Sequence, residues 1–236
     1  MSSRLGPKFR RYIAGIFWGK FPQFYSTADH PVKVPVQMAA YELGTERYMT
    51  AGGSVLDVGY GQGYGLQIMA GKAGRLAGID VDGRAVARTQ QLIAEIPGLE
   101  ALRRYDGYHV PYPDKSFDLV TCVDVLEHVP DYRRLLSDMV RVSRTAVLIS
   151  TPNRRPEYTR PDGKPMNRWH LREWTFAELD PILRQVEGVE IEWHFINGPW
   201  EGPHTRTREV LEDTQALTPV LLRATPAENQ SGPAES

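Results

Sequence analysis

The sequence predicts an α/β protein with a doubly wound, mostly parallel sheet. Between residues 54 and 150, buried strands alternate with amphipathic helices, an order typical of a parallel sheet that helices cover on both faces. The strand at residues 54–58 ends in a turn with glycines at every second position. Residues 188–196 alternate between apolar and polar side chains, which predicts a half-buried antiparallel strand with residues 217–224 as its partner. We therefore expect a mostly parallel sheet whose last strand is antiparallel.

Seven strands and the helices between them account for the periodic part of the chain. The expected strands are residues 54–58, 75–82, 99–107, a fourth strand closed by Val123 and Asp124, residues 145–150, residues 188–196 and residues 217–224. The expected helices include residues 35–49, residues 83–96, one across residues 132–139 and one that starts at a capping box of Thr175 and Glu178. These elements form one domain, residues 50–224, preceded by a helical extension at residues 1–49 and followed by a disordered tail at residues 225–236.

Composition bounds the class of protein. With 236 residues, 41% of them hydrophobic, the chain can bury one sizeable core. A formal net charge of −1 gives no overall field that would attract nucleic acid. Cys122 is the single cysteine, so no internal disulfide can form, and neither a transmembrane run nor a signal peptide is evident. We expect a cytoplasmic protein that does not bind nucleic acid; nothing indicates its oligomeric state.

The N-terminal extension begins with a basic amphipathic helix. Residues 4–20 place aromatic and aliphatic side chains at helical spacing and carry five basic residues and no acid. The favoured interpretation is a helix that packs over the ligand cleft as part of a lid. Peripheral docking on anionic lipid is the alternative, and the sequence leaves both open.

The glycine turn predicts a nucleotide-like ligand. Glycines can adopt positive φ and let the backbone close on a ligand. A dinucleotide-type turn counted from Gly59 would need glycine where Tyr64 stands, and a P-loop would need a lysine that is absent. Asp80 ends the next strand, 21 positions after Gly59, where a carboxylate accepts hydrogen bonds from ribose hydroxyls. The pair indicates an adenosine-type ligand without identifying it.

Residues 105–131 carry the pattern that identifies a family. YDGYHVPYPDKSFDLVTCVDVLEHVPD resembles, in order and spacing, an acid, Val-Pro-Tyr, Ser-Phe-Asp, a strand and Leu-Glu-His of the class I S-adenosylmethionine (SAM) dependent methyltransferases. The turn at Gly59, Gly61, Gly63 and Gly65 resembles motif I of the same family. The resemblance covers about residues 50–153 and implies a Rossmann-like seven-stranded fold with SAM as cofactor.

The resemblance also implies which residues bind the cofactor. They are Asp57, Gly59, Tyr60, Gly61, Gly63, Asp80, Val81, Asp106, Gly107 and Val123. Asp106 would bind the adenine amine. Tyr60 stands where the family usually has cysteine, and its ring is expected beside the methionine part of the cofactor.

Two irregular segments, residues 151–174 and 198–214, are expected to bind the acceptor. Ser-Thr-Pro-Asn followed by Asn-x-x-His-x-Arg-Glu resembles methyltransferases that accompany glycosyltransferases, which implies acceptor contacts for Asn153, Trp169 and Arg172. The favoured acceptor is therefore a hydroxyl of a sugar, a glycan or a related small molecule. A lipid, quinone or polyketide-type acceptor shares every cofactor motif, and a SAM-binding module without catalysis is the alternative from another class.

A hydroxyl acceptor needs a base near neutrality, and histidine is the natural one. His128, directly after the fourth strand, is the favoured base and His170 the second; a structural His128 bonded to backbone is the open alternative. His194 is expected to be exposed, because it alternates with the apolar face of its strand. No cluster has the spacing of a zinc site, so no metal site is predicted, although scattered carboxylates could still hold magnesium.

Overall fold

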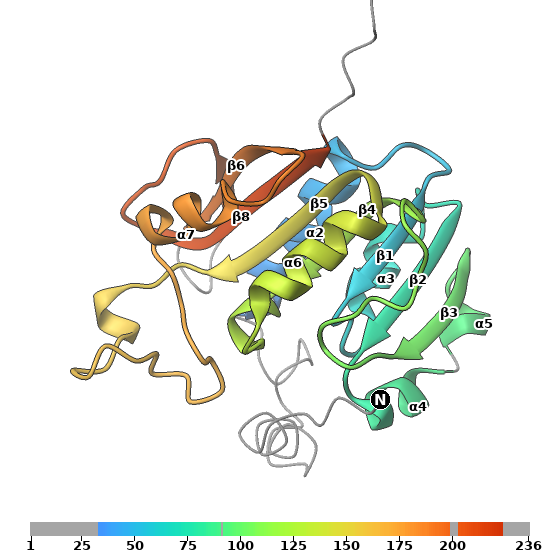
Figure 1. The fold of residues 1–236 in the computed structure, drawn as a ribbon, viewed down its shortest axis with the longest axis horizontal. Coiled ribbons are helices and arrows are strands. Elements are labelled where there is room, and N and C mark those ends of the chain that lie inside the picture. Colours follow the sequence, from blue (N-terminus) through green and yellow to red (C-terminus); the bar gives the residue numbers. More distant parts are fainter. Residues whose placement is uncertain (1–32, 91, 199–202, 224–236) are drawn as a thin grey trace, which may run out of the picture.

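The computed structural model describes residues 33–90, 92–198 and 203–223 (Figure 1). Its sheet has the order β3-β2-β1-β4-β5-β8-β6-β7, with β1 to β5 parallel and β8 antiparallel to both of its neighbours. The strands are β1 Ser54–Val58, β2 Arg75–Asp80, β3 Leu99–Arg104, β4 Phe117–Val123, β5 Ser143–Pro152, β6 Val189–Asn197, β7 Thr205–Thr207 and β8 Thr214–Arg223. The predicted α/β class and the antiparallel last strand are confirmed.

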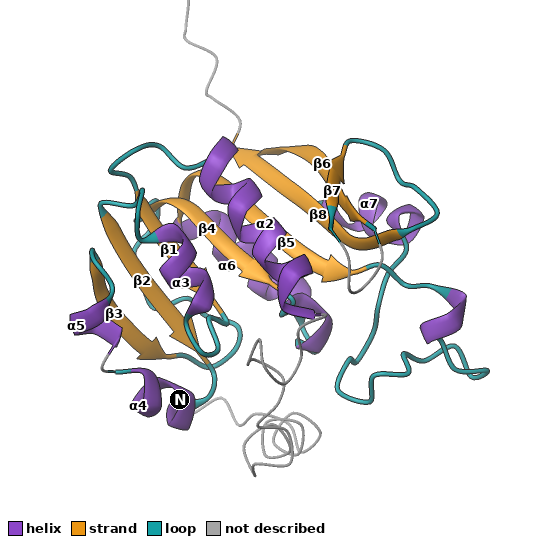
Figure 2. Ribbon diagram, turned by 180° about the vertical axis from the view of Figure 1, so that it is seen from behind, coloured by secondary structure: helices purple, strands orange, loops and turns teal. Residues whose placement is uncertain are grey.

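Helices cover both faces of the sheet. They are α2 Lys33–Arg47, α3 Tyr64–Met69, α4 Gly83–Thr89, α5 Leu92–Glu95, α6 Tyr132–Val142 and α7 Phe176–Leu183, with short 3-10 helices η1 Leu126–His128 and η2 Pro156–Tyr158. Figure 2 shows α2 and α3 on one face, with α6 and α7 behind the sheet. Each face has its own apolar core, so all five residues of β1 are buried. The predicted helix at residues 4–20 and the tail at 225–236 lie outside the described residues.

The predicted number of strands is wrong by one. The eighth strand, β7, lies within residues 198–214, which were expected to be a loop, and pairs antiparallel with β6 through Phe195 opposite Thr207 and Asn197 opposite Thr205. A three-residue Thr-Arg-Thr strand is too short to show a two-residue period, and it forms because the edge of β6 offers free ladder positions. The pairing of β6 with β8 is confirmed.

His194 is buried, contrary to the prediction that it is exposed. Only 2% of its surface is accessible, because the carboxyl end of α2 covers this face of β6. The hydroxyl of Tyr48 meets His194 Nε2, and Arg208 Nη1 lies 3.0 Å from the same nitrogen. Burial, followed by the charge of Arg208, lowers the pKa of His194 to about 4. The alternation of apolar and polar residues distinguishes the two faces of β6. It does not reveal that another element also covers the more polar face.

Two helix predictions have different outcomes. The capping box at Thr175 and Glu178 is present and starts α7, with Pro181 inside the helix. The single helix expected at residues 83–96 is instead divided into α4 and α5. Thr89, at the end of α4, turns its hydroxyl back to the carbonyl of Ala85 at 2.8 Å, a bond that bends or ends helices. Among the described helices none has the length and apolarity needed to cross a bilayer.

Candidate active site

The glycine turn after β1 depends on its glycines. Gly59, Gly61 and Gly63 have φ angles of 75°, 57° and 85°, in the left-handed region where side chains are rarely found. A Cβ at Gly59 would lie 2.4 Å from Cγ2 of Val125, so the turn packs directly against the chain that follows β4. A substitution at Gly59 would therefore combine strain with a clash.

Asp80 is held at the tip of β2 by backbone amides. Its Oδ2 accepts a hydrogen bond from Gly61 N at 3.0 Å, and its Oδ1 accepts one from Asp82 N at 2.8 Å. Burial raises the pKa of Asp80 to about 6. The carboxylate that was predicted to bind ribose is thus fixed against the glycine turn.

Asp57, in β1, is fully buried beneath the same turn. Thr121 donates to it at 2.8 Å, and the Tyr41 hydroxyl lies 3.2 Å from both carboxylate oxygens. Burial raises the pKa of Asp57 to about 7 against the opposing effect of these hydrogen bonds. The ring of Tyr41 would lie 2.3 Å from a Cβ at Gly65, so α2 packs on the start of α3. Sequence reasoning did not single out Tyr41, because nothing in its local pattern differs from that of a core tyrosine.

The side chain of Tyr60 does not line a cleft, contrary to prediction. It is 2% exposed, its hydroxyl lies 3.0 Å from Thr89 Oγ1, and its ring packs where Gly78 leaves room, 2.6 Å from a Cβ built there. The ring is part of the core between β2 and α4. Any contact of Tyr60 with a cofactor would therefore come from its backbone.

The remaining predicted cofactor residues lie along the same edge of the sheet. Asp106 follows β3 and accepts hydrogen bonds from Tyr108 N at 2.9 Å and His109 N at 2.7 Å. Gly107 has a φ of 93°, which only glycine adopts readily. Val81 follows β2 and Val123 ends β4. Since carboxyl ends of parallel strands share one edge, these residues surround one region, and their contacts with a cofactor remain predictions.

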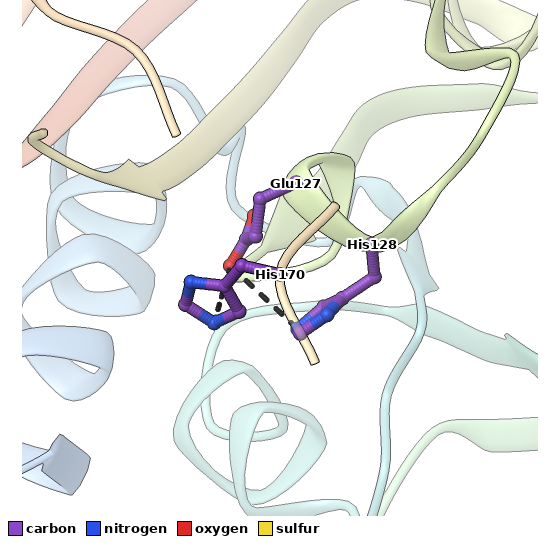
Figure 3. Close-up of side chains that lie close together, drawn as sticks. All are labelled: Glu127, His128 and His170. Atoms are coloured by element: carbon purple, nitrogen blue, oxygen red, sulfur yellow. Dashed lines mark ion pairs between the residues drawn. The ribbon is translucent and has the colours of Figure 1, made fainter. Parts of the chain in front are cut away.

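Glu127, His128 and His170 come together at this edge and are called the Glu-His-His cluster below (Figure 3). Glu127 and His128 belong to η1, directly after β4, whereas His170 comes from the segment 151–174. Glu127 Oε1 lies 3.7 Å from His128 Nε2 and 3.9 Å from His170 Nε2. A backbone hydrogen bond of 3.0 Å from Leu171 N to Glu127 O fixes the segment to η1.

Each member of the cluster is oriented by a further contact. His170 Nδ1 lies 2.5 Å from Glu173 Oε1, and His128 Nδ1 lies 3.0 Å from the carbonyl oxygen of Trp169. The Glu127 side chain is fully buried, and its Oε2 accepts a hydrogen bond from the Thr151 hydroxyl at 3.1 Å. The two imidazoles therefore turn their Nε2 atoms toward a buried carboxylate.

Comparison with known proteins finds similar methyltransferases. Residues 56–149 match the family described as "Methyltransferase domain". A probable S-adenosylmethionine-dependent methyltransferase of Mycolicibacterium smegmatis is 37% identical over 60% of this chain and 54% of its own length. Residues 56–149 therefore form a methyltransferase domain, and the chain is similar to class I SAM-dependent methyltransferases.

Two further similarities agree with this result. A ubiquinone biosynthesis O-methyltransferase of Hahella chejuensis is 32% identical over 48% of each chain. Magnesium protoporphyrin IX methyltransferase of Synechocystis PCC 6803, solved with bound SAH, shares the fold with a TM-score of 0.63 at 15% identity and covers 92% of this chain and 94% of its own. The chain spans 54 to 60% of the length of the first curated relatives that it matches. SAM is the cofactor of the family.

Of the predicted acceptor residues, Asn153 and Arg172 form hydrogen bonds with backbone carbonyls of the protein itself. Asn153 Nδ2 donates to Thr214 O at 3.0 Å, which ties the start of segment 151–174 to β8. Arg172 Nη1 donates to Val129 O at 2.6 Å, and its guanidinium lies over the Tyr132 ring. Both side chains therefore hold parts of the chain together. Their contact with an acceptor remains a prediction.

The Glu-His-His cluster and the groups bonded to it include two residues that sequence reasoning did not choose, Glu127 and Glu173. Glu127 stood in the Leu-Glu-His pattern without an assigned role, and Glu173 stood in the Asn-x-x-His-x-Arg-Glu pattern without one. The sequence contains a Glu-His pair and, further along, a His followed by Glu three residues later. These two short patterns are only a weak indication of a shared site. Their convergence depends on the path of residues 151–174, which no local pattern specifies.

Proposed function

We propose that this protein transfers the methyl group of SAM to a hydroxyl oxygen of a small-molecule acceptor. The proposal rests on the position of the Glu-His-His cluster. Glu127 comes two residues after Val125, and the side chain of Val125 packs against Gly59 of the glycine turn. A group able to handle the acceptor's proton therefore lies near the cofactor motifs.

Methyl transfer from a sulfonium is an in-line displacement that depends mainly on positioning. The acceptor oxygen forms a bond with the methyl carbon, the carbon–sulfur bond breaks, and its electron pair stays on sulfur as S-adenosylhomocysteine (SAH). The hydroxyl proton must leave the oxygen. In this proposal the cluster takes charge of that proton, since imidazole nitrogens titrate near neutrality.

We further propose an acceptor with an apolar part, of lipid or quinone type. Two apolar side chains on the segment that carries His170 are exposed, Met166 at 58% and Leu171 at 40%. Leu171 directly follows His170. A ubiquinone biosynthesis O-methyltransferase is among the relatives, which supports an amphiphilic acceptor.

A sugar acceptor is the second candidate. It was suggested by the Asn-x-x-His-x-Arg-Glu pattern, whose side chains form contacts within the protein. Asn167 and Glu173 both contact His170, at 2.9 and 2.5 Å, while Arg172 bonds to backbone carbonyls. These three residues therefore have structural partners, so their pattern alone gives no reason to expect a sugar. The apolar acceptor is favoured for this reason.

Trideuteromethyl-labelled SAM distinguishes the two candidates. We expect label on a hydroxylated quinone or phenolic lipid and none on free sugars or oligosaccharides, measured by mass spectrometry. Leu171→Ser should raise the KM for the amphiphile about 10-fold with kcat unchanged, the scale of one lost apolar contact.

Lys164→Ser is the matched control, because Lys164 lies on the same segment and pairs with Asp162 at its surface. Its KM should equal that of the wild type. Label on sugars alone, or an unchanged KM in Leu171→Ser, would refute the apolar acceptor; no label on any acceptor would refute methyl transfer.

A further inference from the structure

The tautomer of His170 is determined by its neighbours. Trp169 N donates to Asn167 Oδ1 at 3.0 Å, so the Asn167 oxygen is committed and its amide nitrogen faces His170 Nε2 at 2.9 Å. An NH₂ group only donates, so Nε2 must accept with a lone pair. The ring hydrogen of neutral His170 therefore sits on Nδ1 and points to Glu173.

His128 is oriented in the same sense. Its Nδ1 lies 3.0 Å from the Trp169 carbonyl oxygen, which can only accept, so Nδ1 carries the hydrogen. In the neutral ring, Nε2 then has a lone pair, and it faces Glu127 Oε1 at 3.7 Å. Both histidines thus direct their hydrogens away from the cluster and their lone pairs into it.

The cluster therefore concentrates electron-rich atoms. The Nε2 atoms of two neutral imidazoles and a carboxylate oxygen of the fully buried Glu127 lie within 4.8 Å of one another. Such atoms repel one another unless a proton or a cation lies among them, and one cation can engage all three at once. We propose that Glu127, His128 and His170 bind one divalent transition-metal ion.

The chemistry of the donors specifies the kind of ion. Two imidazoles with one carboxylate suit zinc, iron or manganese better than magnesium or calcium, which prefer oxygen ligands alone. Bonds of about 2.1 Å would bring tetrahedral ligands to about 3.4 Å from one another. The two Glu–His separations of 3.7 and 3.9 Å need to shorten by a few tenths of an ångström. The two imidazole nitrogens, which lie within 4.8 Å of each other, need to approach by up to about 1.4 Å.

The groups around the histidines match a metal site. Metal-bound histidine usually donates its other ring hydrogen to a carboxylate or a backbone carbonyl. Glu173 provides the first kind of acceptor and Trp169 O the second. The metal would replace the Asn167 amide at His170 Nε2.

The ion deepens the proposed function, and its role in transfer rests on that function. Three protein ligands leave at least one coordination position for the acceptor oxygen. Coordination lowers the pKa of a bound hydroxyl, so its proton passes to solvent before the oxygen attacks the methyl carbon. In the metal-bound protein the histidines would assist removal of that proton as ligands of the ion, which refines the role that the proposed function gives to the cluster.

Equilibrium dialysis of the chelator-treated full-length protein with Zn²⁺ tests the site, with Co²⁺ absorption as a spectroscopic readout. We expect one equivalent of metal and d–d bands of a low-coordinate site. Glu127→Gln and His128→Ala should each weaken Zn²⁺ affinity by more than about 100-fold, and Glu173→Gln by about 10-fold. His109→Ala is the matched control, since that imidazole is 61% exposed and lies outside the cluster.

Equal Zn²⁺ affinity in the wild type and in Glu127→Gln would overturn the proposal, as would no stoichiometric uptake by the wild type. Glu127→Gln keeps the shape of a buried side chain, so it serves as the readout if the alanine variant fails to fold. Full methyl transfer by metal-free protein would overturn the metal's role while the proposed function stands. One equivalent of bound metal without transfer to any acceptor would support the site and refute the proposed function.

Discussion

Replacing His128 by alanine is expected to lower methyl transfer by about 100- to 10,000-fold, the usual cost of losing a group that handles the reacting proton. SAM affinity should change by less than about twofold, because the cofactor motifs lie on other residues. His128 is the better choice than His170, since it belongs to η1 at the end of a core strand, whereas His170 depends on the segment 151–174. Turnover kinetics and calorimetric SAM titration of the same preparations measure both quantities.

The control is His109→Ala, which removes an exposed imidazole and should leave turnover unchanged. His170→Ala provides a second comparison, and we expect a smaller loss with a raised acceptor KM. If His170→Ala loses turnover at constant KM while His128→Ala does not, the roles are reversed. If neither substitution matters, positioning alone accounts for the catalysis.

Replacing Asp80 by alanine is expected to weaken SAM binding by about 1.5 to 3 kcal/mol, roughly 10- to 150-fold, the scale of a charge-assisted hydrogen bond. The carboxylate is already held by two backbone amides, so the loss is not offset by rearrangement of a mobile side chain. Calorimetric titration with SAM measures the effect, and Asp114→Ala, at a carboxylate that is 73% exposed, is the control. Unchanged affinity in Asp80→Ala would contradict the cofactor geometry.

The affinity for SAM is also expected to depend on pH, and the direction of the change can be derived. Burial raises the pKa of Asp80 to about 6 and that of Asp57 to about 7 in the unliganded protein. SAM is cationic and its ribose donates hydrogen bonds, so both favour ionised carboxylates. Affinity should therefore be full above pH 7 and fall as the pH decreases through 7 and 6, by about tenfold per pH unit for each group once the pH is below its pKa. Asp80→Asn should remove the lower of the two steps.

The cofactor half of the site could be predicted from the sequence because its signals are local. The glycine turn and Asp80 each end a strand, and parallel strands bring their ends to one edge. The Glu-His-His cluster could not be predicted in the same way. Leu171, the residue after His170, donates a backbone hydrogen bond to Glu127 between segments far apart in the chain, and no periodicity reports that contact.

The errors of prediction at Tyr60 and His194 share one physical cause. Tyr60 and His194 were placed by their own strand or motif, but their burial depends on which elements cover them. Tyr60 fills the space above Gly78, and His194 lies under α2. A sequence pattern shows which side of an element a residue occupies, and packing determines what lies against that side.

The central claim is that the cofactor turn and the Glu-His-His cluster are two parts of one active site. The structure of the protein in complex with SAH tests this most directly. We predict ribose hydroxyls at Asp80 and a sulfur atom directed toward His128, with room for one acceptor oxygen at the near-attack distance of about 3 Å from the transferred methyl group. A homocysteine part that points away from His128, or a sulfur screened from the cluster by protein atoms, would contradict the account.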